Sequence, residues 1–168
     1  MKANYRKLLI TCHIVVSVSL IGAVSCFLVL AFFGMLTTTQ EIQRVTYPAM
    51  ELLAVYIILP MAIASLVIGI VQSLYSPWGL VQHYWVLAKL VLSALTIGVL
   101  LMQFETIHTL ATIAAHTTFS ANDMGQQMRV IIHATGGLFV LLLATVLSVY
   151  KPKGMTRFGM GKIKNAQP

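Results

Sequence analysis

Four long apolar segments alternate with short polar stretches along the chain. The segments cover residues 8–33, 47–74, 78–103 and 130–150. Each is long enough for the ~20 residues that a membrane-spanning helix needs. We therefore predict an all-α, up-and-down transmembrane four-helix bundle in residues 1–150, followed by a basic cytoplasmic tail at 151–168.

Two prolines affect the predicted helices. Pro77 falls at the start of the third segment, where the first turn of a helix tolerates proline. Pro60 lies inside the second segment, where its missing N–H should leave the carbonyl of Tyr56 unbonded. We expect a kink in the second span at this point.

The composition supports a membrane environment. Apolar residues make up 58% of the 168 residues and charged residues only 9%, whereas about 25% of an average soluble protein is charged. So few charges cannot cover a globule in water. Lipid is the solvent that such a surface fits.

The charges also give the bundle a direction. Eight of the eleven Lys and Arg residues flank the outermost spans: Lys2, Arg6, Lys7, Lys151, Lys153, Arg157, Lys162 and Lys164. The four acidic residues fall on or beside the first and third loops: Glu41, Glu51, Glu105 and Asp123. The positive-inside rule then places both termini in the cytoplasm of a multi-pass plasma-membrane protein. No aromatic platform accompanies the cations of the net +7 charge, so nucleic acid is not expected as a partner.

A cleaved signal peptide is the alternative for the first span, because basic residues precede it and Ala23-Val24-Ser25-Cys26 resembles a lipoprotein cleavage box. The apolar run is too long for a signal peptide and favours a retained span. No Walker loop, dinucleotide fingerprint, nucleophile elbow or zinc spacing occurs in the sequence. Nothing in the sequence therefore suggests nucleotide hydrolysis or covalent catalysis, and whether the chain is an enzyme is left open.

Ionisable residues inside membrane spans are costly, so each is a candidate for function. His13 and His83 both lie about five residues from the cytoplasmic end of their spans, the first and the third. These spans are diagonal neighbours in an up-and-down bundle. The two imidazoles are therefore candidate axial ligands of a haem, although two histidines can also share a depth by chance.

Three further histidines and Glu51 lie toward the opposite side. His133 is followed at i+3 and i+4 by Gly136 and Gly137, which leaves a bare helix face for either a flat macrocycle or another helix. Glu51, His108, His116 and His133 form a candidate copper or zinc site of nitrogen and oxygen ligands. The alternative is that these polar residues are simply close to water.

Lys89 lies about eleven residues into the third span. It belongs to a polar stripe at helical spacing that consists of Gln82, Trp85, Lys89, Ser93, Thr96 and Gln103. Lys89 is therefore a candidate partner for a haem propionate or another anion inside the bundle. The competing interpretation is that its long side chain reaches back to the cytoplasmic headgroups.

Two stretches carry a resemblance to a known family: Trp78-Gly79-Leu80-Val81-Gln82-His83-Tyr84-Trp85-Val86-Leu87-Ala88-Lys89-Leu90 and Leu147-Ser148-Val149-Tyr150-Lys151-Pro152-Lys153-Gly154-Met155-Thr156. The chain resembles a family of small four-helix bacterial membrane proteins of unknown function, the DUF2269 type. The resemblance implies a four-helix protein of the bacterial inner membrane and supplies no site residues. More distantly, the layout is similar to four-helix membrane cytochromes b and copper-resistance membrane proteins.

The leading hypothesis is a membrane b-type haem protein in electron transfer, haem handling or sensing. His13 and His83 would ligate one haem b, Lys89 would pair with a propionate, and His133 would serve a second cofactor with His108 or His116. The alternatives are a copper- or zinc-handling protein that uses the Glu51 and histidine cluster, and a non-catalytic assembly subunit. Expected partners are the lipid bilayer and another membrane or redox protein; oligomerisation is left open.

Overall fold

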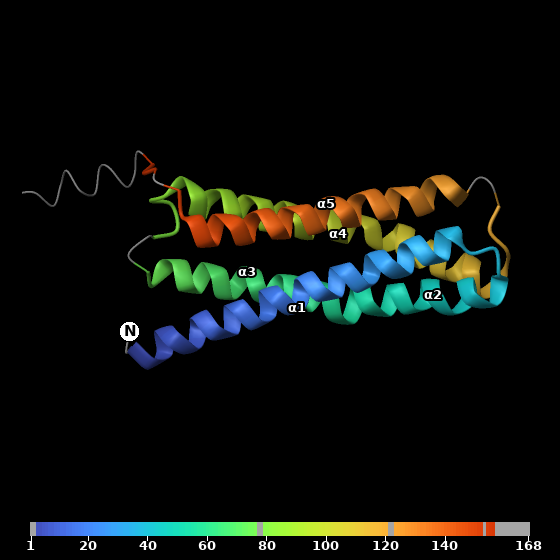
Figure 1. Ribbon diagram of the computed structural model, residues 1–168, viewed down its shortest axis with the longest axis horizontal. Helices are drawn as coiled ribbons and strands as arrows, with labels where there is room; N and C mark the ends of the chain where they lie inside the picture. Colours follow the sequence, from blue (N-terminus) through green and yellow to red (C-terminus); the bar gives the residue numbers. More distant parts are fainter. Residues whose placement is uncertain (1–2, 77–78, 121–122, 153, 157–168) are drawn as a thin grey trace, which may run out of the picture.

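The computed structural model describes residues 3–76, 79–120, 123–152 and 154–156. Its elements in chain order are α1 (Ala3–Leu36), α2 (Gln40–Leu53), the π-helical turn η1 (Ala54–Ile58), α3 (Leu59–Leu74), α4 (Tyr84–His116) and α5 (Met124–Tyr150). Because α2, η1 and α3 form one continuous rod, four helical rods run up and down (Figure 1). All four are long and apolar enough to cross a membrane. The predicted all-α transmembrane bundle is confirmed.

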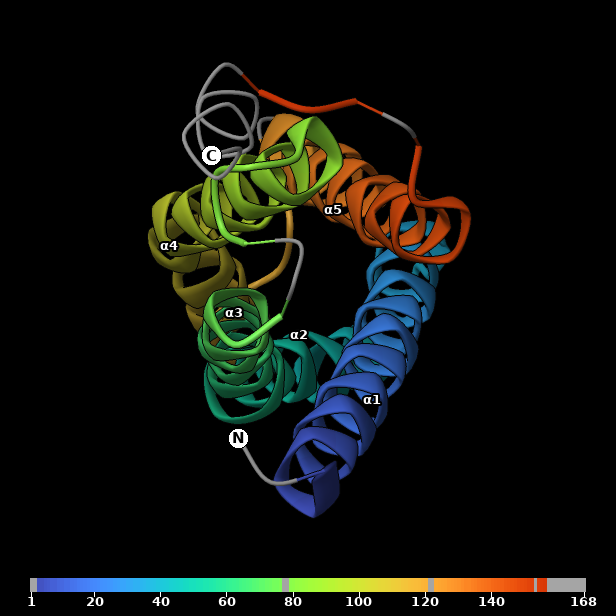
Figure 2. The ribbon, with the colours of Figure 1, turned by 90° about the vertical axis from the view of Figure 1, so that its left-hand side faces the viewer.

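The rods form a ring in which α1 lies between α5 and the α2–η1–α3 rod, and α4 lies between the same two elements on the opposite side (Figure 2). The first and third spans are therefore diagonal, as predicted. We call the end where α1 begins and α5 ends the tail end, and the opposite end the loop end. The termini of the described bundle share the tail end, as an even number of spans requires.

The third helix differs from the predicted third span at both ends. The third helix begins at Tyr84, after the predicted start at residue 78, and it continues to His116, beyond the predicted end at residue 103. Residues 104–116 had the polarity of a loop, but they form an amphipathic helix: Ile107, Leu110, Ala111 and Ala114 are buried, whereas Glu105, His108, Thr112 and His116 are exposed. Packing against α2 makes this helical segment stable although its sequence is not apolar.

The other helices also extend beyond the predicted spans, since α1, α2 and α5 begin before residues 8, 47 and 130. Pro77 lies outside the described residues. Most of the basic tail at 151–168 lies outside them as well.

Pro60 produces a change of helical register in the second rod. It lies in the first turn of α3, directly after η1. At this junction the Leu59 N–H bonds the carbonyl of Ala54, five residues earlier, instead of the usual four. The wider π turn makes room for the proline ring and shifts the hydrogen-bond pattern at the residue that lacks an N–H. The irregularity at the position of the predicted kink is therefore a π turn.

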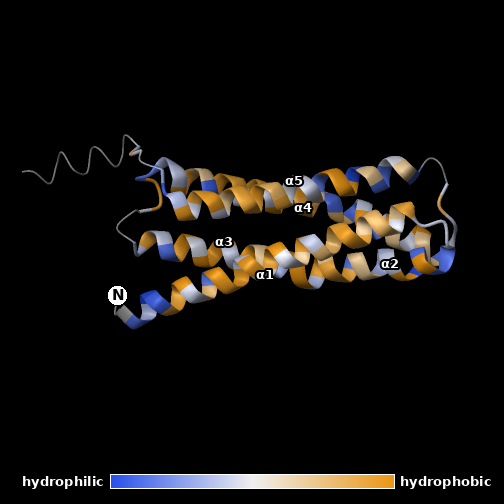
Figure 3. Cartoon of the chain, in the orientation of Figure 1, coloured by the Kyte–Doolittle hydropathy of each residue, from blue (hydrophilic) through white to orange (hydrophobic). Residues whose placement is uncertain are grey.

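The helices are longer than a bilayer is thick. α1 has 34 residues and α4 has 33, which at ~1.5 Å per residue is about 50 Å, against about 30 Å of hydrocarbon. The bundle therefore projects beyond the lipid. Figure 3 agrees, since the middle of the bundle is mostly apolar and hydrophilic residues gather toward its ends.

The tightest core lies toward the loop end. Its side chains are almost inaccessible and include Tyr47, Met50, Leu110, Ala114, Val130 and Ile131. Phe119, in the connection between α4 and α5, covers this core with its ring 4.8 Å from that of Tyr47. The loop end is therefore the most closely packed part of the described bundle, and the larger cavity lies toward the opposite end.

Candidate functional site

A cavity of about 630 Å³ lies between α1, α3, α4 and α5 in the tail-end half of the bundle. Its walls are mainly apolar, from residues such as Ile10, Leu66 and Leu90. Its polar groups are mostly cations, hydroxyls and amides. Among the described residues that line it there is no Asp or Glu.

Lys89 is the innermost cation of this cavity. It is half-buried on α4, and its ammonium group donates a hydrogen bond to the hydroxyl of Ser148 on α5. That hydroxyl in turn donates to the carbonyl of Ala144, at 2.9 Å. Arg6 and Lys151 add two further cations nearer the tail end of the cavity. With no carboxylate in the lining, the cavity presents a positive field to whatever enters it.

His13 lies in the same cavity, on α1. Its Nδ1 is buried and has no hydrogen-bond partner among the described residues. The ring rests on Gly69 of α3, where an added Cβ would lie 3.2 Å from His13 Cε1. Gly69 therefore provides the space for the imidazole, whose buried Nδ1 is left without a hydrogen bond, and such an unsatisfied polar atom is costly.

His83 has a different environment from His13. It immediately precedes α4 in an extended conformation, and its backbone forms an antiparallel bridge with Met155. The bridge is extended by a 2.9 Å hydrogen bond from the Thr156 N–H to the carbonyl of Gln82. The His83 side chain is buried, and it is not among the residues that line the tail-end cavity. The structure therefore does not bring His13 and His83 together in that cavity, because α4 begins one residue after His83.

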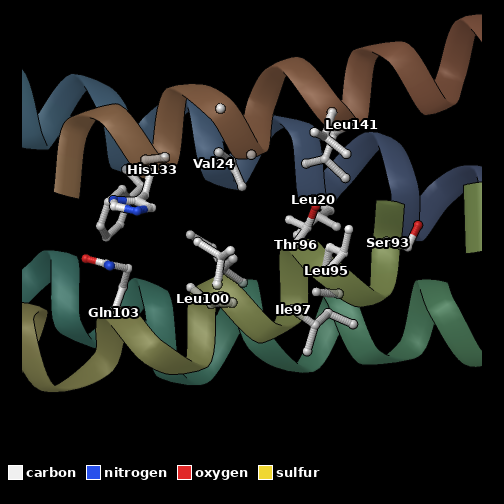
Figure 4. A pocket seen from close by; sticks show the side chains of 18 of the residues that line it. Leu20, Val24, Ser93, Leu95, Thr96, Ile97, Leu100, Gln103, His133 and Leu141 are labelled. Carbon is white, nitrogen blue, oxygen red and sulfur yellow. The ribbon is translucent and has the colours of Figure 1, made fainter. Parts of the chain in front are cut away.

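A second cavity of about 370 Å³ continues toward the loop end, and we call it the inner pocket. It shares Ser65, Leu66 and Ser93 with the tail-end cavity. Figure 4 shows His133 of α5 and Gln103 of α4 at one end of this pocket, on facing sides. The other walls are almost entirely apolar. The polar stripe predicted along the third span faces these cavities, since Trp85, Lys89, Ser93, Thr96 and Gln103 all line one or the other.

The predicted outer metal cluster is only partly assembled. His108 Nδ1 lies 2.7 Å from Glu51 Oε1, which joins α4 to α2. His116 is exposed in the last turn of α4, and His133 lines the inner pocket instead. In the part of the chain that the structure describes, no group of three or more His, Cys, Asp and Glu residues is arranged to hold a metal ion.

No known protein family, curated protein or solved structure matches this chain. The resemblance to the bacterial four-helix family therefore stays a prediction. Sequence reasoning missed Arg6 and Gly69 as components of the tail-end cavity. A glycine in an apolar span gives no sign of what its missing side chain makes room for, and Arg6 had the position of an ordinary cytoplasmic anchor.

Proposed function

We propose that this chain is a membrane b-type haem-binding protein whose haem occupies the tail-end cavity. The observation that carries the proposal is the Nδ1 of His13, which has no partner among the described residues, in a cavity whose described lining includes cations and no carboxylate. A haem is a large, mostly apolar ring with two propionate groups. It needs an imidazole or similar ligand, an apolar wall and positive charge, and this cavity offers all three.

The residues have distinct roles in this proposal. His13 holds the iron, and the apolar walls exclude water from the ring. Lys89 and Arg6 neutralise the propionates, with Lys89 held in place by Ser148. Haem, when bound, would supply one-electron chemistry, and the chain would tune it through ligation, charge and burial.

The proposal differs from the sequence-based hypothesis in its ligand set. His83 lines neither cavity, so the cavity offers one histidine ligand from this chain near its cations. A b-type haem held by His13 alone has an open coordination position, which suits sensing or haem transfer better than electron transfer between fixed partners.

Absorption spectroscopy tests this proposal. The protein is expressed with ample haem precursor, purified in detergent, and examined for a Soret band that shifts on reduction. His13→Ala should lose most of the band and Lys89→Met should weaken haem retention. The matched control, His116→Ala, removes an exposed histidine at the end of α4 and should leave the band unchanged. A colourless wild-type protein contradicts the proposal, and a band that survives His13→Ala contradicts the ligand assignment.

The contact between Glu51 and His108 is the one observation that favours the copper or zinc alternative, because a histidine that ligates a metal commonly bonds a carboxylate through its other nitrogen. Elemental analysis of the same preparations tests it. A colourless protein that retains neither copper nor zinc would instead support the role of an assembly subunit.

A further inference from the structure

The inner pocket has two polar side chains at one end, the amide of Gln103 and the imidazole of His133, in a mainly apolar space. Gln103 Oε1 is buried and has no partner among the described residues. His133 Nδ1 lies 2.7 Å from the carbonyl oxygen of Arg129, one helical turn earlier. A carbonyl can only accept, so Nδ1 carries the hydrogen, and in the neutral ring Nε2 is left as an acceptor.

Two hydroxyl groups of the pocket are already bonded within the bundle. Thr96 Oγ1 donates to the carbonyl of Leu92 at 2.8 Å, within its own helix. Ser65 shares a hydrogen bond with Ser17, away from the His133 end of the pocket. The Gln103 amide also carries N–H donors, so this end of the pocket can both accept a hydrogen bond, at His133 Nε2, and donate one. It therefore favours a molecule with a hydroxyl group on an apolar body.

The pocket also has a lateral entrance. Leu95 and Val99 on α4, and Ile132 and Gly136 on α5, line the pocket and are exposed at the surface of the bundle. An added Cβ on Gly136 would meet no atom within 4 Å, so the space beside it is open. These residues belong to membrane-spanning helices. Access between α4 and α5 is therefore from the lipid, and it selects a lipid-soluble molecule.

We propose that the inner pocket binds a lipid-soluble phenol or quinol, which enters between α4 and α5 and donates its hydroxyl hydrogen to His133 Nε2 or Gln103 Oε1. The cavity of about 370 Å³ has room for one substituted ring, and small-molecule pockets typically begin at about 300 Å³. A hydrocarbon tail on the ring would extend through the lateral entrance into the bilayer. This site does not depend on haem in the tail-end cavity.

A pair of probes that differ in one hydrogen-bond donor tests the proposal. 4-Nonylphenol and its methyl ether have the same apolar body, but only the phenol can donate. Their binding to the full chain in lipid nanodiscs is measured by calorimetric titration, with empty nanodiscs subtracted. We expect the phenol to bind roughly 10-fold more tightly than the ether, which is the usual size of one well-placed buried hydrogen bond.

Variants of the chain identify the side chains that cause the phenol to bind more tightly than the ether. The double variant His133→Leu, Gln103→Leu should bind the phenol and the ether equally, whereas His116→Leu, outside the pocket, should keep the roughly 10-fold difference. Gly136→Leu should weaken both probes, because its side chain fills the entrance while both acceptors remain. Unchanged helical circular dichroism and elution volume establish that each variant is folded. Equal binding of both probes to the wild type, or a preference that survives in the double variant, overturns the proposal.

Discussion

Gly69 is the position where one added carbon should have the clearest consequence for the tail-end cavity. A Cβ on Gly69 would lie 3.2 Å from His13 Cε1, 3.8 Å from Nε2 and 3.9 Å from Nδ1. Carbon atoms in contact ordinarily lie about 3.5–4.0 Å apart. Alanine therefore requires the imidazole to move by a few tenths of an ångström. Valine adds two more carbons on the same side and cannot coexist with the ring in its present place.

Two effects compete in this substitution. Replacing glycine by alanine inside a helix stabilises it by at most about 1 kcal/mol. Forcing extra carbons into a filled space costs roughly 1–3 kcal/mol. For Gly69→Ala the small shift of the ring, toward an open cavity, should nearly cancel the gain. For Gly69→Val the steric cost dominates, so we expect net destabilisation and displacement of His13.

Gly22 provides the matched control, because it is a helical glycine of α1 with no atom within 4 Å of an added Cβ. Thermal unfolding in one detergent, followed by circular dichroism, compares the two positions. A change of 1 kcal/mol corresponds to about 2–4 °C in Tm for a chain of this size. Gly69→Val should lower Tm by several degrees, whereas Gly22→Val should leave it within about 2 °C. Equal Tm values for the two valine variants would refute the packing of His13 against Gly69.

Two further predictions test the packing and the orientation of the bundle. Leu110 is 1% exposed in the loop-end core, and Leu110→Ala should lower the free energy of unfolding by roughly 2–5 kcal/mol. Leu95 is 61% exposed on α4, and Leu95→Ala should lower it by less than about 1 kcal/mol. Urea titration of unfolding in detergent measures both values, and similar losses at the two sites would contradict the uneven packing. A fluorescent protein fused to the C-terminus should fluoresce in cells, and alkaline phosphatase fused after Asp123 should be active, because the basic tails are expected to stay in the cytoplasm. The opposite pattern of reporter activity would show that the predicted orientation of the bundle is wrong.

The uneven packing connects the architecture with both proposed sites. The core at the loop end fixes the four rods relative to one another through residues such as Met50 and Leu110. Within hydrocarbon the hydrophobic effect does not force apolar helices together. The bundle can therefore keep cavities there without losing its fold, and the polar side chains of α4 line them.

The hydropathy pattern of the sequence was sufficient for the architecture. An apolar run of about 20 residues has no other satisfactory conformation in a bilayer than a helix, so the four spans could be read directly. The polar stripe around Lys89 was also predicted, because a continuous polar face on a membrane helix must point away from lipid. Even the diagonal relation of the first and third spans followed from the up-and-down order.

The helix ends and the partners of individual side chains were decided by tertiary structure. Residues 104–116 lack the hydropathy of a span, but packing against α2 makes them helical. The start of α4 at Tyr84 moved His83 out of the helix and into a bridge with Met155, which is distant in sequence. A hydropathy profile does not locate a helix end to within a few residues, yet a shift of this size decides which histidine lines a cavity.

The same distinction applies to the sites. The sequence determined that His13, Lys89 and His133 lie inside the membrane region, since their positions within apolar runs fix their depth. Only the tertiary structure decided that His13 rests on Gly69 and shares a cavity with Lys89, and that His133 faces Gln103. Depth follows from residue number along a helix, whereas the direction in which a side chain points depends on how neighbouring helices are rotated and packed.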